Sequence, residues 1–240
     1  MKRLIYILLS IVFFSACQQE ELAPQKGESV LELDLLLMGR PAMQVTRAVD
    51  QDLAVDIFDA DGSLYRHYNA GAVDKKIVLE PGTFKVVAYT ENQETWPSAN
   101  NGKGEACYYA ETSVLMEYDK TVYLTLNVPM SNYAVGLQLP DLWDVLFRSY
   151  TFTLKSGSRT TTILAGDRAY FDVADGGFRY ALSATNTDNR TSYHSAIEYK
   201  DVSAGKLYTL RYSYDSNATS GGVDIVITDD MGTDDSNISL

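Results

Sequence analysis

The sequence is poor in the side chains that most often carry catalysis or bind metals. It has two cysteines and two histidines in 240 residues, too few for a disulfide framework or a multi-histidine metal site. The motifs of acyl transfer, zinc proteolysis, phosphate binding and dinucleotide binding are missing. Acidic residues abound, but nothing in the sequence fixes two carboxylates across a cleft, as glycoside hydrolysis requires. We therefore predict a protein that is not an enzyme and that uses no cofactor or metal.

Basic residues are also in deficit, with 20 Lys and Arg against 32 Asp and Glu, for a formal net charge of −12. Nucleic acid binding and electrostatic adhesion to anionic lipid both require clustered cations. The composition thus argues against nucleic acid as a partner. Attachment to a membrane would have to come from buried methylene groups of a lipid chain.

The N-terminus has the layout of such an anchor. A basic pair precedes the apolar run Leu4–Phe14, which is too short to span a bilayer as a helix. The next residues, Ser15-Ala16-Cys17, resemble the lipobox of bacterial lipoprotein signals, although Phe14 stands where leucine is usual. The resemblance implies that residues 1–16 are a signal peptide and that the Cys17 thiol carries a diacylglycerol. A soluble secretory signal and an uncleaved anchor are the alternatives.

Residues 17–28 are polar and contain Pro24 and Gly27, which predicts a flexible tether. Glu20 and Glu21 resemble the acidic export signals of bacterial surface lipoproteins, although they are also ordinary tether residues. We expect a lipid-anchored protein of the outer membrane that is exposed at the cell surface.

From Ser29 onward the apolar residues recur with a period of two, which is typical of strands with one buried face. Leu31, Leu33 and Leu35, for example, alternate with Glu32 and Asp34. Turn signals separate the alternating segments, and the strands are predicted at 29–37, 53–57, 63–68, 75–79, 83–90, 106–116, 121–128, 133–139, 150–155, 159–164, 169–173, 178–184, 193–199, 207–214 and 223–228. The predicted class is all-β, built from antiparallel β-sandwiches.

Pro129 ends one of these strands, and we place a domain boundary there. The prediction is an N-terminal β-sandwich at 29–128, a C-terminal β-sandwich at 129–228 and an acidic tail at 229–240. Two tandem domains of related fold would explain a faint internal repeat, whose members are Gly82–Lys85 with Gly176–Arg179 and Lys120–Leu126 with Lys206–Tyr212. Chance would explain it as well, because hairpins favour glycine followed by an aromatic residue.

Two turns and one helix complete the local predictions. Asp59-Ala60-Asp61-Gly62 predicts a hairpin turn, and although it begins like a calcium loop, no Glu closes the motif. Glu80-Pro81-Gly82 predicts a type II turn that closes a second hairpin. Asp141–Phe147 predicts a short helix after the first strand of the second domain, with Asp141 as its N-cap. Its predicted apolar stripe consists of Leu142, Val145 and Leu146.

The segments Val55–Leu64 and Ile77–Tyr89 resemble the first domain of fimbrillin-like surface lipoproteins of the Bacteroidota, in particular an uncharacterised branch assigned to a domain of unknown function. The resemblance covers nearly the whole mature chain, as a pattern of strands and turns. It implies two tandem transthyretin-like sandwiches and a structural, accessory or adhesive subunit of a fimbrium.

In the pilin members, a protease cuts after an arginine behind the first strand, and a strand of the next subunit fills the vacated groove. The resemblance therefore implies Arg47, or else Arg40, as a processing site, and other pilin-like subunits as partners through β-strand addition. The alternative, which we favour, is that both arginines are solvated loop residues and that the first strand stays in place.

The polar loop 91–105 is the candidate ligand site. Trp96 could stack on a sugar ring beside the amides of Asn100 and Asn101, so a carbohydrate- or protein-binding module is the alternative function. More often, a tryptophan in such a loop closes the edge of the sandwich. Cys107 lies in an apolar run and is expected to be a small buried residue, since nothing places a histidine beside it.

Overall fold

The structure is a computed structural model that describes residues 27–38, 53–91, 96–214 and 223–228. Cys17, Arg40 and Arg47 lie outside the described residues, as do the 229–240 tail and nearly all of the predicted tether. Among the described helices, none is both long and apolar enough to cross a bilayer. The described residues are mostly strands with short helical turns, so the predicted all-β class is confirmed.

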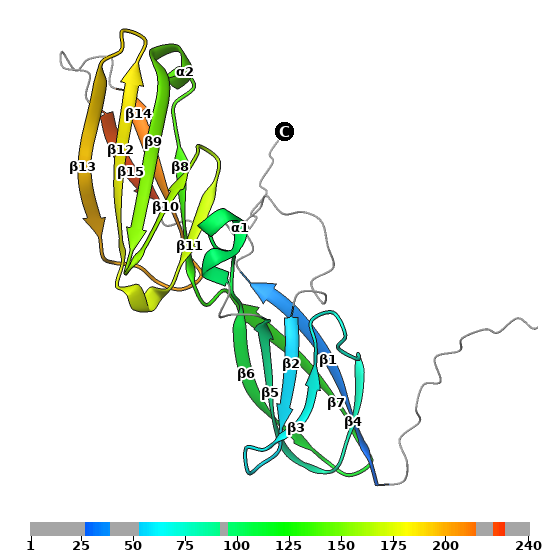
Figure 1. Cartoon of the computed structure of the whole chain (residues 1–240). Helices are drawn as coiled ribbons and strands as arrows, with labels where there is room; N and C mark the ends of the chain where they lie inside the picture. The colour runs from blue at the N-terminus through cyan, green and yellow to red at the C-terminus, as the bar shows by residue number, and fades with distance from the viewer. Residues whose placement is uncertain (1–26, 39–52, 92–95, 215–222, 229–240) are drawn as a thin grey trace, which may run out of the picture.

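The first half of the chain forms two facing sheets, with strand orders β4-β1-β7 and β3-β2-β5-β6 (Figure 1). One cluster of buried side chains, drawn from both sheets, fills the space between them. The strands are β1 Ser29–Met38, β2 Leu53–Phe58, β3 Leu64–Tyr68, β4 Lys76–Leu79, β5 Gly82–Thr90, β6 Tyr109–Met116 and β7 Thr121–Pro129.

The second half repeats this arrangement around its own buried cluster, with strand orders β11-β8-β14-β15 and β10-β9-β12-β13. Figure 1 shows the two halves end to end. The strands are β8 Tyr133–Gln138, β9 Phe147–Ser156, β10 Arg159–Ile163, β11 Arg168–Phe171, β12 Phe178–Asn186, β13 Thr191–Tyr199, β14 Leu207–Tyr214 and β15 Val223–Thr228.

β1 lies in the middle of its sheet, antiparallel to β4 and parallel to β7. Its alternation decides which side chains are buried: Leu31, Leu33 and Leu35 face the core with at most 8% of their surface exposed, whereas Asp34 is exposed. Full burial of a leucine contributes about 1.5–3 kcal/mol. The first strand is therefore a central part of the first core.

The second core is built around aromatic rings, and Tyr133 at the start of β8 is its centre. This fully buried ring contacts those of Phe171 and Tyr208 at 5.8 Å and that of Phe178 at 6.1 Å between centroids. Its hydroxyl lies 3.0 Å from Gly177 O, to which it donates a hydrogen bond, and burial raises the pKa of Tyr133 to about 12. A buried tyrosine thus keeps a partner for its polar end.

The strand pairing places the matching segments of the faint repeat at equivalent positions in the two halves of the chain. β1 to β7 correspond in order to β8 to β14, and the same hydrogen bond ties the first strand to the seventh in each half. Val30 N donates to Lys120 O at 3.0 Å, and Ala134 N donates to Lys206 O at 2.9 Å. β15 has no counterpart among the described strands of the first half.

Of the two predicted hairpins, one is wrong and the other is confirmed. Glu80-Pro81-Gly82 does not close a hairpin, since β4 pairs with β1 in one sheet while β5 pairs with β2 and β6 in the other. Alternation and turn residues show that a chain reverses, but they do not show which strand it then pairs with. The Asp59–Gly62 turn does join paired strands, with Ser63 N donating to the Asp59 carboxylate at 2.9 Å.

The predicted helix exists but faces the other way. α2 spans Trp143–Leu146, its N-cap is Leu142 rather than Asp141, and the cap has no side-chain hydrogen bond. Trp143 is the buried residue and stacks on Phe147 at 4.1 Å, whereas Leu142 and Val145 are each 66% exposed. The indole ring is the largest apolar side chain in this segment, and its burial against Phe147 orients so short a helix.

Gly177 provides a test of the packing between β12 and β13. A Cβ at this position would lie 2.2 Å from Tyr199 O, and the backbone has φ +121°, so we expect Gly177→Ala to destabilise the protein by more than about 3 kcal/mol in urea unfolding. Gly166→Ala is the matched control, because Gly166 has φ +84° but no atom within 4 Å of an added Cβ. Its expected cost is about 1–2 kcal/mol of backbone strain alone. Equal losses for the two variants would contradict the packing described here.

Candidate functional site

A loop of the first half meets strands β10 and β11 of the second half at the junction. The loop contains the single turn η2, Trp96–Ser98, and the short helix α1, Ala99–Gly102, which Figure 1 shows beside β10 and β11. Asn100 and Asn101 have φ values of 50° and 58°, so α1 is an irregular turn rather than a regular helix. Asparagine tolerates this left-handed backbone better than most residues.

Arg159, the first residue of β10, joins the two halves. Its guanidinium carbon lies 5.2 Å from the centre of the Trp96 ring and 4.8 Å from that of the Phe171 ring. Nη1 donates to Tyr170 O at 2.7 Å, and Nη2 donates to Gly102 O across the junction at 3.1 Å. Burial lowers the pKa of Arg159, but an arginine remains charged at neutral pH. The cation is thus held by two aromatic rings and two carbonyls.

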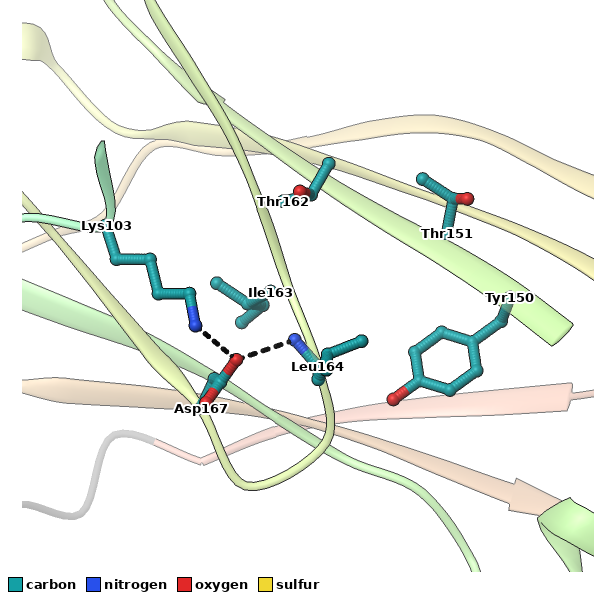
Figure 2. Close-up of a pocket in the computed structure, with 7 residues that line it drawn as sticks. All are labelled: Lys103, Tyr150, Thr151, Thr162, Ile163, Leu164 and Asp167. Carbon is teal, nitrogen blue, oxygen red and sulfur yellow. Dashed lines mark hydrogen bonds and ion pairs between the residues drawn. The ribbon is translucent and has the colours of Figure 1, made fainter. Parts of the chain in front are cut away.

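Lys103 makes a second connection (Figure 2). Its carbonyl accepts from Tyr170 N at 2.8 Å, and its Nζ donates to Asp167 Oδ2 at 2.6 Å. The same carboxylate oxygen accepts from Leu164 N at 3.1 Å. The hydrogen bond from Lys103 lowers the pKa of Asp167, which keeps this carboxylate charged. The next residue, Gly104, has φ +79°, and an added Cβ would lie 3.0 Å from Arg159 Nη2.

A surface pocket of about 270 Å³ lies beside this ion pair. Figure 2 shows its lining, which consists of Lys103, Tyr150, Thr151, Thr162, Ile163, Leu164 and Asp167. The pocket offers one cation, one carboxylate, three hydroxyl groups and one aromatic ring, and Tyr150 Oη accepts from Ala165 N at 2.8 Å. Hydroxyl and charged groups of this kind can bind a small polar molecule, but they include no nucleophile paired with a base.

The three predicted ligand-binding residues differ in their exposure and in their contacts within the chain. Trp96 is half-buried and has the Arg159 cation over its ring, so that face already has a partner within the chain. Asn100 and Asn101 are both exposed. Ligand binding by the loop stays a prediction, and Arg159, Lys103 and Asp167 were not predicted from the sequence. No local signal marks them, because each is a single charge whose partner comes from a distant segment.

Cys107 is buried, with 3% of its surface exposed, so the prediction of a small buried residue is confirmed. Its backbone N–H donates to Asn132 Oδ1 at 3.0 Å, and the Asn132 amide donates to Glu105 O at 2.8 Å. Burial raises the pKa of the Cys107 thiol to about 12. The thiol is therefore protonated at neutral pH, which disfavours a nucleophilic role.

His67 forms a small polar cluster on the outer face of the first half. Its Nδ1 lies 2.6 Å from Asp56 Oδ1 and its Nε2 lies 2.9 Å from Asn69 Oδ1. With both oxygens as acceptors, the imidazolium form is favoured because it donates at both nitrogens. The hydrogen bond to Asp56 raises the pKa of His67.

The fold and the junction define an all-β protein with two sheets in each half. The chain belongs to the family described as Domain of unknown function (DUF4493), whose model matches residues 28–239. The resemblance to an uncharacterised branch assigned to a domain of unknown function is thereby confirmed. A comparison with curated proteins gave no match.

Two solved structures with TM-scores above 0.5 show the same fold at low sequence identity, and a third is reported beside them. A proposed cell adhesion protein of Bacteroides uniformis is 14% identical with a TM-score of 0.52, and the match covers 85% of this chain and 99% of that one. A proposed cell adhesion protein of Bacteroides eggerthii is 13% identical with a TM-score of 0.51, over 86% and 96% of the two chains. The fimbrial anchor protein Mfa2 of Porphyromonas gingivalis is 14% identical with a TM-score of 0.40, over 84% and 98%.

Arg159 and Trp96 should stabilise the junction as a pair. We expect Arg159→Ala to lower the free energy of unfolding by about 2–3 kcal/mol, since two charged hydrogen bonds and the ring contacts are lost. Trp96→Ala should cost less when Arg159 is already absent, with a coupling energy above about 0.5 kcal/mol in a double-mutant cycle. Arg179→Ala is the control, because Arg179 is 59% exposed and makes a surface ion pair. Strict additivity of the two junction variants would show that the pair does not act as a unit.

His67 should give a small pH dependence of stability. A folded-state pKa raised above 6.5 contributes stability that is complete below pH 6.5 and is lost as pH rises through the folded-state pKa. The stability difference between the wild type and His67→Gln should therefore be largest near pH 5.5 and decline towards pH 8. In an NMR titration, Asp56→Asn should move the pKa of His67 down. An unchanged pKa in that variant would contradict the role of Asp56.

Proposed function

We propose that this protein is a lipid-anchored cell-surface protein of the outer membrane, held by Cys17, which acts as a fimbrillin-like structural, accessory or adhesive subunit and not as an enzyme. The fold shared with two proposed cell adhesion proteins over 85% and 86% of the chain carries the proposal. The lipobox-like Ser15-Ala16-Cys17 and the family match support it.

In this proposal β1 stays in place in the mature protein. β1 pairs with β4 and β7 on its two sides and buries Leu31, Leu33 and Leu35 between the sheets. Its removal would expose the first core and cost several kcal/mol unless another strand took its position. A cut after Arg47, or after Arg40, would release β1 together with Cys17. In this competing form of the protein, the groove that β1 leaves between β4 and β7 accepts a strand of another pilin-like subunit.

A carbohydrate- or protein-binding role for the loop 91–105 is the second candidate. The exposed amides of Asn100 and Asn101 and the hydroxyl-lined pocket at Lys103 favour it. The contact between Trp96 and Arg159 weakens the case for sugar stacking on Trp96, because a sugar could stack only on the other face of the indole.

The anchor can be tested on protein purified from membranes. We expect an intact mass that begins at a diacylglycerol-modified Cys17 and includes Arg47, and we expect Cys17→Ser to abolish lipid labelling and release the protein from the membrane fraction. Cys107→Ala is the control, because the buried Cys107 should not affect labelling.

A mature protein that begins after Arg47 or Arg40 would overturn the form with β1 retained and support strand exchange. Unlabelled wild-type protein in the soluble fraction would instead overturn the lipid anchor itself.

A further inference from the structure

Among the described strands, none lies beyond the outer edge of β7, whereas the same edge in the second half is covered. β7 ends the described sheet β4-β1-β7, whereas its counterpart β14 is flanked by β15 in the sheet β11-β8-β14-β15. β15 runs antiparallel to β14, with Thr209 opposite Thr228, Arg211 opposite Val226 and Ser213 opposite Asp224. The second half therefore shows how a strand is added at this position of the fold.

The hydrogen bond between β1 and β7 fixes which β7 groups point outward. Lys120 O accepts from Val30 N, so it points towards β1. Within a strand, the backbone groups of successive residues point to opposite sides. The N–H and C=O groups of Tyr123, Thr125 and Asn127 therefore point away from β1, towards the open edge. By the correspondence of the halves, these three residues match Thr209, Arg211 and Ser213, which lie opposite β15.

β7 also lacks the features that usually protect an edge. Its sequence from Thr121 to Pro129 contains no charged residue, and its one proline is the last residue. The other edge strand of this sheet, β4, has four residues and begins with Lys76. In the opposite sheet, the edge strand β3 carries Arg66 and His67 and is interrupted by an irregular register. Long, uncharged edges are those that accept another strand.

β6 does not cover this edge along its length. The chain turns from β6 into β7 through residues 117–120, and at the far end Tyr108 and Met130 form an isolated bridge. Between these points the described residues of β6 and β7 form no ladder, since β6 pairs with β5 and β7 pairs with β1. Each strand is the edge of its own sheet there.

The charge beside β7 indicates what kind of strand fits. On the outer face of β1, Glu32 and Asp34 lie in register with Tyr123 and Thr125 of β7; Glu32 also lies opposite Lys76 of β4, whereas Asp34 lies beyond the β4 register and is exposed. A strand added beside β7 would lie two strand spacings, about 9.6 Å, from the backbone of β1, so that extended Lys or Arg side chains could approach the Asp34 carboxylate. Acidic side chains on the same face would instead be repelled.

We propose that the outer edge of β7 is an acceptor for an extended basic segment of a partner protein. The segment adds antiparallel to β7 in the register that β15 shows on β14, with aliphatic residues towards the core and Lys or Arg residues outward. β1 remains in place, so this site is independent of the Cys17 anchor and of cleavage after Arg47.

Amide hydrogen exchange in the full mature chain carrying Cys17→Ser tests the open edge first. The amides of Tyr123, Thr125 and Asn127 should exchange at least about tenfold faster than those of Val122, Leu124 and Leu126, which face β1. Equal protection of the two sets would mean that the edge is already closed, and would overturn the proposal.

A matched pair of peptides then tests the occupant. The probe is Lys-Val-Lys-Ile-Lys-Val-Lys, and its twin carries Glu in place of each Lys. The basic peptide should slow exchange at Tyr123, Thr125 and Asn127 at least about tenfold and the acidic twin should not. Thr125→Pro, which removes one outward N–H, should abolish this protection, whereas Thr125→Val should retain it. Equal effects of the two peptides, no effect of either, or protection retained in Thr125→Pro would each overturn the proposal.

Discussion

The position of the first strand, between an antiparallel and a parallel neighbour, is the constraint on which each half depends. β1 joins β4 to β7, and β8 joins β11 to β14. The parallel neighbour is contributed by the seventh strand of the half, so Val30 meets Thr121 and Ala134 meets Leu207. Neither core can close until most of its half has been ordered, because these contacts join distant parts of the chain. Each half is therefore expected to form as a cooperative unit.

The junction links these two units through side chains as well as through the chain itself. Between β7 and β8, Asn132 O accepts from Gly205 N at 2.9 Å while its side chain accepts from Cys107 N, so one residue contacts both halves. Arg159 and Lys103 connect β10 and β11 to the loop around α1. Partly buried charge pairs with well-defined geometry favour one relative orientation more than they add stability. We infer that these contacts hold the loop 96–104 in a fixed conformation against the second half.

The strands could be predicted from the sequence because their physical cause is local. A period of two places alternate residues on opposite faces, as in Leu31–Leu35, and all fifteen predicted strands have counterparts in the structure. Strand pairing is not local, which is why the Pro81-Gly82 turn was assigned to a hairpin although it crosses between the sheets. The same limit applies to the junction: Trp96 could be singled out from its own loop, but its partner Arg159 lies in a strand of the other half, and a lone arginine carries no sign of its partner. Tertiary packing likewise determined which face of α2 is buried.

The open edge of β7 follows from how the chain connects the halves. The chain leaves β7 at Pro129 and enters β8 at Tyr133, so it has no residues at that point with which to return alongside β7. After β14 it does return, and β15 covers the equivalent edge. A tandem arrangement of this fold therefore leaves one edge uncovered at the inner half unless a distant or foreign segment supplies the strand. β-strand addition would need no new pocket in such a molecule, because no described strand lies opposite the outward backbone groups of β7, in a register that its own second half displays.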